Sequence, residues 1–163
     1  MTSIIAERSD GIEVEHFHGF ADLEVAKDLR PGQRGIHDMS GPRPGQRTAT
    51  GPNAIIVNPR PGFEVYARYE LWNGPPAADP AWDELWVGSL FLASGRVCGV
   101  SEIEGEVRYY PAFDLGREMT SWQARLCSKF LENDGEPGFP RHLYRINLLT
   151  LQFWLPEDGS PSV

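Results

Sequence analysis

The chain has 163 residues and a formal net charge of −8. This acidic balance argues against a nucleic-acid-binding protein, which uses a basic surface to displace counterions from phosphates, and against an anionic membrane as the partner. Seventeen glycines and fourteen prolines favour a turn-rich β fold over a helical bundle. We expect residues 1–156 to form a single β-sandwich domain, followed by a disordered tail at 157–163.

The first residues carry no basic segment followed by an apolar run, so no signal peptide is predicted. No stretch approaches the roughly 20 apolar residues that cross a membrane. We therefore expect a cytoplasmic protein. Its two cysteines, Cys98 and Cys127, are then expected to be free buried thiols rather than a disulfide.

The N-terminal third begins with one predicted strand. Residues 11–20 alternate in polarity, which places Val14, His16 and His18 on one face. Residues 21–26 are consistent with either a second strand or a single helical turn. Residues 54–57 are a brief apolar stretch that we interpret as an edge strand.

Between these elements the composition changes. Twelve of the 34 residues from 29 to 62 are Gly or Pro, and the motif Arg-Pro-Gly-Gln-Arg occurs at 30–34 and again at 43–47. A long loop of this kind is usually functional or disordered. We therefore predict an extended basic loop or arm over 29–53, whose candidate partner-binding cations are Arg30, Arg34, Arg43 and Arg47.

The remaining sequence predicts a series of strands. Residues 63–71 and 122–130 each alternate with one solvent-facing side, and residues 106–112 form a shorter strand. The run from 82 to 100 is interpreted as a hairpin that turns at Ser94-Gly95, with Trp86 on its buried face. Residues 143–155 are apolar on both faces, which is typical of a central or covered strand. The fold class is therefore all-β: an antiparallel β-sandwich of seven to nine strands, with a small closed barrel as the alternative.

Four segments carry a resemblance to known proteins. They are Tyr69-Glu-Leu-Trp-Asn-Gly-Pro-Pro76, Trp82-Asp-Glu-Leu-Trp86, Ser94-Gly-Arg96 and Tyr144-Arg-Ile-Asn-Leu148. The arrangement resembles a group of small actinobacterial β-sandwich proteins, and its layout is distantly similar to acidic nuclease inhibitors of bacterial competence systems. The chain departs from the group at Asp114-Leu-Gly-Arg-Glu118, where a Pro-Gly-Thr-Tyr turn is usual. The resemblance implies a fold and no activity.

One pair of residues is spaced like metal ligands. His16 and His18 are two apart on a predicted strand, so both imidazoles point to one face and could share a divalent metal, with Glu24 as a third ligand. A cupin-like site would need a closer glutamate and a second histidine motif. The competing interpretation is two partly exposed histidines on a polar strand face. Likewise, Glu102, Glu104 and Glu106 are interpreted as an acidic, solvated strand face rather than a glycosidase pair.

The sequence favours a non-catalytic protein that binds a protein partner or self-associates, with no cofactor. An immunity or inhibitor role against a basic partner suits the acidic charge, through electrostatic steering and aromatic anchors. The candidate anchors are Tyr66, Trp72 and Tyr110. The alternative is a metal-dependent, cupin-like enzyme or small-ligand binder that uses His16 and His18.

Overall fold

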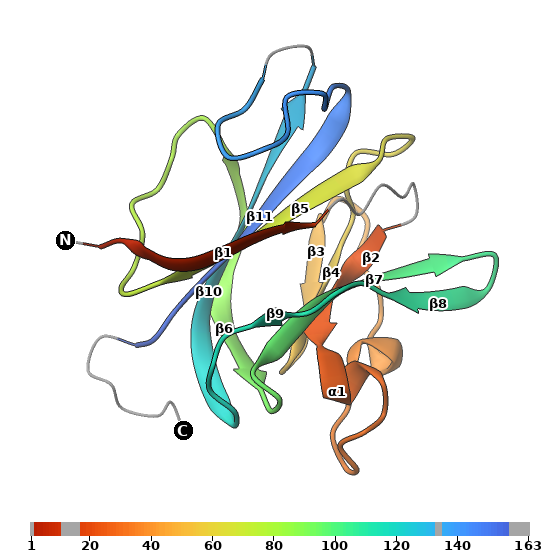
Figure 1. Ribbon diagram of the computed structural model, residues 1–163. Coiled ribbons are helices and arrows are strands. Elements are labelled where there is room, and N and C mark those ends of the chain that lie inside the picture. The colour runs from red at the N-terminus through yellow and green to blue at the C-terminus, as the bar shows by residue number, and fades with distance from the viewer. Residues whose placement is uncertain (1, 11–16, 133–134, 157–163) are drawn as a thin grey trace.

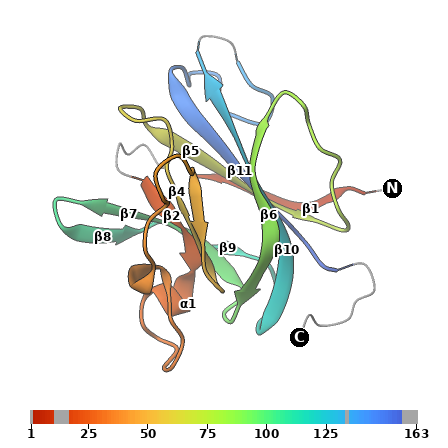
Figure 2. The same ribbon diagram turned by 180° about the vertical axis from the view of Figure 1, so that it is seen from behind.

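The computed structural model describes residues 2–10, 17–132 and 135–156, and these form two packed β-sheets (Figure 1 and Figure 2). The all-β sandwich is confirmed. Eleven strands are present in the described residues, against the seven to nine predicted, because short or weakly patterned strands at 4–10, 48–50 and 113–114 gave no alternating signal. The predicted tail at 157–163 lies outside the described residues, and the assignment of 1–156 to one domain stays a prediction.

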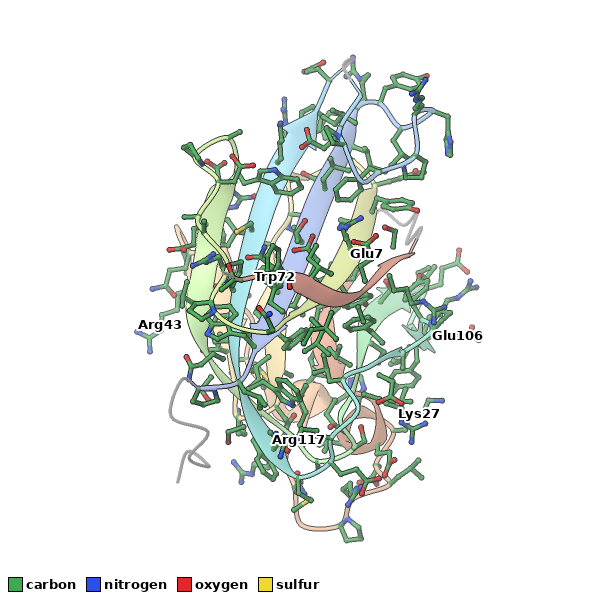
Figure 3. The ribbon with its side chains drawn as sticks, turned by 60° about the vertical axis from the view of Figure 1, so that its left-hand side comes forward. Glu7, Lys27, Arg43, Trp72, Glu106 and Arg117 are labelled. Atoms are coloured by element: carbon green, nitrogen blue, oxygen red, sulfur yellow. The ribbon has the colours of Figure 1, made fainter. Side chains whose placement is uncertain are left out.

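The five-stranded sheet contains the longest strands. Its order is β1 (Ile4–Asp10), β5 (Val65–Trp72), β11 (Ile146–Trp154), β10 (Thr120–Leu131) and β6 (Asp83–Leu92). The sheet is not wholly antiparallel, because β5 and β11 run parallel. The final strand β11 is buried on both faces, as predicted, and lies between β5 and β10. Figure 3 looks onto the outer face of this sheet.

The second sheet has shorter strands. Its order is β3 (Thr48–Thr50), β4 (Ala54–Val57), β2 (Phe17–Asp22), β7 (Arg96–Ile103) and β8 (Glu106–Tyr109), and β9 (Phe113–Asp114) also pairs with β7. The predicted edge strand β4 is therefore an interior strand. After β2 the chain makes a single helical turn, α1 (Leu23–Ala26), which the Asp22 carboxylate caps by accepting hydrogen bonds from the N–H groups of Glu24 and Val25.

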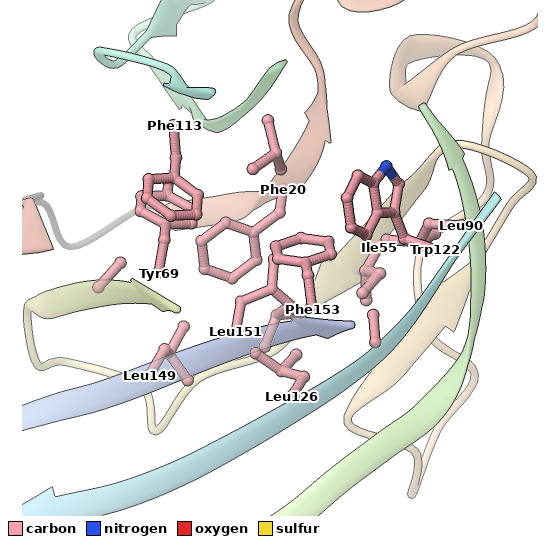
Figure 4. Close-up of a cluster of buried hydrophobic side chains, with 14 of the residues drawn as sticks. Phe20, Ile55, Tyr69, Leu90, Phe113, Trp122, Leu126, Leu149, Leu151 and Phe153 are labelled. Atoms are coloured by element: carbon pink, nitrogen blue, oxygen red, sulfur yellow. The ribbon is translucent and has the colours of Figure 1, made fainter. Parts of the chain in front are cut away.

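The main core fills the space between the sheets (Figure 4). Trp122 is the largest of the fully buried side chains described, and its burial agrees with the alternation predicted for β10. Aromatic rings cross the interface: Tyr69 of β5 stacks on Phe113 of β9 at 5.6 Å, and Phe20 of β2 meets Tyr69 edge-on. Trp86, which we placed on the buried face of the hairpin, is only partly buried against this core.

The prediction of a hairpin at 82–100 is wrong. Strands β6 and β7 do not pair, since β6 joins β10 in one sheet and β7 joins β2 and β8 in the other. The Ser94-Gly95 turn is a corner at which the chain changes sheets. Asp22 holds this corner, because its Oδ2 accepts hydrogen bonds from the Ser94 N–H at 2.9 Å and the Ser94 hydroxyl at 3.1 Å. Gly95 has a φ of 70°, and a Cβ there would lie 2.2 Å from the Arg117 carbonyl oxygen.

The basic segment is also more ordered than predicted. Residues 29–53 were expected to be loop throughout, yet they include a 3₁₀ helix, η1 (Ile36–Asp38), and strand β3. Ile36 is fully buried and belongs to a second apolar cluster with Ala54 and Ile56 of β4. The segment is therefore packed onto the second sheet rather than extended away from it.

Candidate functional site

A hollow of about 370 Å³ lies on the outer face of the five-stranded sheet. Its floor is made by alternate residues of β5, β10 and β11, and its walls come from the two loops that follow β5 and β10. The lining side chains are Arg68, Glu70, Trp72, Ala77, Asp79, Trp82, Arg125, Cys127, Glu136, Pro137, Phe139, Thr150 and Gln152. Trp72 projects from this face in Figure 3. We call this hollow the outer cavity.

A buried carboxylate organises the floor of the outer cavity. Glu70 is 7% exposed, and its Oε2 accepts a hydrogen bond from Arg68 Nε at 2.8 Å. Its Oε1 accepts one from Trp72 Nε1 and one from Gln152 Nε2, each at 2.9 Å. Arg68 also pairs with Glu7 of β1. This network fixes the Trp72 indole against the sheet, so its position is set before any ligand binds.

Arg125 of β10 forms the opposite side of the floor. Its Nη1 donates to the Pro76 carbonyl at 2.9 Å, and its Nε forms an ion pair with Glu84 at 3.2 Å. The guanidinium also lies 5.5 Å from the centre of the Trp154 ring. Both floor arginines are therefore held by the protein's own acceptors.

The face predicted to be solvent-facing on residues 63–71 is largely covered. Tyr66 is only 9% exposed and packs with Leu143 and Leu148 in a third apolar cluster. The ring of Phe139 lies 5.8 Å from the Tyr66 ring and stacks on Trp82 at 5.9 Å. Tyr66 is thus part of the cavity's support, whereas Trp72 lines the cavity itself. Sequence reasoning missed Trp82 and Phe139 as cavity residues for different reasons. Trp82 was assigned to the first strand of the predicted hairpin, whereas β6 begins only at Asp83. Phe139 lies in a loop, where no alternation marks a face.

The cavity's cysteine is unsuited to nucleophilic chemistry at neutral pH. Burial, partly offset by Arg125, raises the pKa of the Cys127 thiol to about 11. Reactive cysteines have a lowered pKa instead, because the thiolate is the nucleophile. Cys98 is buried within the second sheet, and burial raises its pKa to about 12. Neither cysteine therefore has the lowered pKa of a reactive thiol.

The histidine pair is placed only in part. His16 lies outside the described residues, and His18 is on β2, where burial lowers its pKa. Glu24 is not available as a third ligand, because its two carboxylate oxygens pair with Arg30 and Arg96 at 2.9 and 2.7 Å. Among the residues that the structure describes, no three His, Cys, Asp or Glu side chains are grouped as a metal site.

The remaining candidate residues are dispersed. Arg30 is not part of a free arm, since it bonds Glu24 and the Ala93 carbonyl. Tyr110 packs against the main core, with its hydroxyl buried. The other three cations are exposed, and we call them the outer arginines: Arg34, Arg43 and Arg47.

The three carboxylates interpreted as one strand face are arranged differently. Glu102 is the second-last residue of β7, and Glu106 is the first residue of β8. Glu104 lies in the turn between the two strands, with a φ of 52°. They form an acidic tip on the β7–β8 hairpin, which projects from the sandwich (Figure 1). The prediction of a single alternating strand here is wrong because Glu104 and Gly105 form the turn.

No helix in the described part of the chain is both long and apolar enough to cross a bilayer. The sequence matches no family model and no curated protein. The fold is similar to the crystal structure of ComJ from Bacillus subtilis, an inhibitor of the DNA-degrading activity of NucA. The similarity covers 96% of this chain and 99% of ComJ, with a TM-score of 0.54 and 9% sequence identity. The predicted similarity in layout to a competence nuclease inhibitor is therefore confirmed at the level of the fold.

Proposed function

We propose that the protein is a non-catalytic, cytoplasmic binding module of the inhibitor or immunity type, which captures a basic protein partner. The observation that carries this proposal is the shared fold over nearly the full length of both this chain and ComJ. The net charge of −8 supports a basic partner, since complementary charge accelerates association. Binding of nucleic acid is disfavoured by the same charge.

Exposed carboxylates are concentrated at two places that suit such a partner. One is the acidic tip of the β7–β8 hairpin, formed by Glu102, Glu104 and Glu106. The other is the outer cavity, where Asp79 and Glu84, the ion-pair partner of Arg125, are exposed. A protein partner is favoured over self-association because two copies of this chain repel each other at neutral pH.

The test pairs the purified protein with nuclease-like or toxin-like proteins encoded beside its gene. We expect a stoichiometric complex on size-exclusion chromatography that lowers the partner's activity. The complex should weaken as salt rises from about 50 to about 300 mM, because screening reduces the contribution of exposed charges. A complex that leaves the partner fully active would refute an inhibitor role, and the absence of any complex at low salt would refute the whole proposal.

A further inference from the structure

We propose that the outer cavity receives an arginine side chain of the basic partner. This inference rests on the proposed function and adds the contact through which the partner is recognised. Three features of the cavity support it: its own cations are already paired, carboxylates are in excess, and aromatic rings form part of its wall.

The cavity's arginines are directed at internal acceptors rather than at a ligand. Arg68 donates to Glu70, to the Gly138 carbonyl at 2.9 Å and to Glu7. Its side chain is 12% exposed, and that of Arg125 is 14% exposed. Arg68 is therefore satisfied within the protein, and Arg125, whose Nε makes no hydrogen bond within the described chain, is held by its ion pair with Glu84 and by its bond to the Pro76 carbonyl. Buried cations that are engaged in this way offer little to an anionic ligand. The cavity is therefore a poor site for a phosphate or a carboxylate.

Carboxylates outnumber cations at this site. The lining residues and their direct ion-pair partners comprise three cations and five carboxylates, an excess of two negative charges. They are Arg68, Arg125 and Lys129 on one side and Glu7, Glu70, Asp79, Glu84 and Glu136 on the other. Asp79 is exposed and has no ion-pair partner within the described chain. It is the carboxylate best placed to meet an incoming cation.

The walls favour a guanidinium over other cations. Trp72, Trp82 and Phe139 line the cavity, and Trp82 and Phe139 are stacked together. Aromatic faces attract cations, and the flat guanidinium stacks on them better than a compact ammonium does. The volume of about 370 Å³ lies within the range of small-ligand sites, roughly 300–1,000 Å³. One arginine side chain fits.

The chain offers a closely matched pair of variants. Asp79 Oδ1 accepts a hydrogen bond from the Ala81 N–H at 2.9 Å, and Asp114 Oδ1 accepts one from the Gly116 N–H at 2.8 Å. Both aspartates are exposed, and Asp114 lies on the other sheet at β9. Asp79→Asn and Asp114→Asn therefore remove the same charge and keep the same type of turn, and only the first alters the cavity.

The first measurement uses a defined probe and no partner. N-acetyl-arginine methylamide and its neutral analogue N-acetyl-citrulline methylamide are titrated into the labelled protein, and the indole N–H signals of Trp72 and Trp82 are followed by NMR. We expect saturable chemical-shift changes with the arginine probe and none with the citrulline probe. In Asp79→Asn the affinity for the arginine probe should be about fivefold weaker. Equal shifts with both probes, or none with either, would overturn the proposal.

The second measurement uses the partner found by the inhibition test. Asp79→Asn should weaken the complex about fivefold or more, and Asp114→Asn by less than about twofold. Equal effects of the two variants would overturn the cavity proposal and leave the inhibitor function standing. Conversely, failure of every partner complex would remove the proposed function, and the probe titration would still decide whether the cavity binds arginine.

Discussion

Replacement of Glu70 by glutamine tests whether the hydrogen bonds in the floor of the outer cavity contribute to the free energy of unfolding. The substitution keeps the shape of the side chain and removes its charge. The amide oxygen can still accept from Trp72 and Gln152, since both bond the same oxygen of Glu70. The amide nitrogen then faces Arg68 Nε, and both groups are hydrogen-bond donors. The charged hydrogen bond of 2.8 Å between Arg68 Nε and Glu70 Oε2 is therefore lost.

The expected cost follows from that geometry. One charge-assisted hydrogen bond in a mostly buried site is lost, which removes about 1.5–3 kcal/mol. Loss of a whole buried pair costs about 3–5 kcal/mol, but Arg68 keeps Glu7 and the Gly138 carbonyl, so the lower range applies. We expect the free energy of unfolding to fall by about 2–3 kcal/mol.

The control is Glu7→Gln, which removes the other carboxylate partner of Arg68. The Glu7 side chain is 51% exposed, against 9% for Glu70, so its loss should cost less than about 1 kcal/mol. Urea unfolding monitored by tryptophan fluorescence and circular dichroism measures both values. If Glu70→Gln and Glu7→Gln cost the same within about 0.5 kcal/mol, burial does not set the strength of this network and the reasoning fails.

Three further results are expected. Arg30→Ser should lower the melting temperature by roughly 2–4 °C, while replacing the three outer arginines with serine leaves it nearly unchanged; equal effects in a thermal scan would contradict the packing of Arg30. A hydrogen bond from Arg96 is the main cause of a lowered pKa of the Glu24 carboxyl group. The ionised Glu24 side chain therefore stabilises the fold at neutral pH, and this contribution is lost as the pH falls from about 4.5 through the lowered pKa. The difference in melting temperature between the wild type and Glu24→Gln should therefore narrow in acid, and a difference that widens would contradict the assignment. Elemental analysis of the purified protein should find no stoichiometric Zn, Fe, Mn or Ni; a bound metal that disappears in His16→Ala would restore the metal-dependent alternative.

The fold class was predictable because alternation is a local property. The burial of Trp122, Ala124 and Leu126 on one face of β10 follows directly from residue spacing. The connection at Ser94-Gly95 was not predictable in the same way. A serine-glycine turn suits both a hairpin and a corner between sheets, and the choice depends on Asp22, which is 72 residues away from Ser94.

The outer cavity was predictable only in fragments. Trp72 was proposed as an anchor because it lies on a face that also carries charge, but the hydrogen bond from Gln152 to Glu70 joins residues 82 positions apart and has no local signal. The alternation of residues 63–71 correctly separates two faces. It cannot show that Trp82 and Phe139 cover the polar face, because these contacts join segments far apart in the sequence.

The central position of β11 constrains the order in which the chain can acquire its structure. Strands β5 and β10 have no direct pairing and are joined only through β11. Both earlier strands are synthesised before residues 146–154, so the five-stranded sheet has two unfilled edges until β11 is available. Pairing of β5 with β11 spans some 80 residues, and such distant contacts form slowly. A nascent or truncated chain that lacks β11 is therefore expected to be the most aggregation-prone state of this protein.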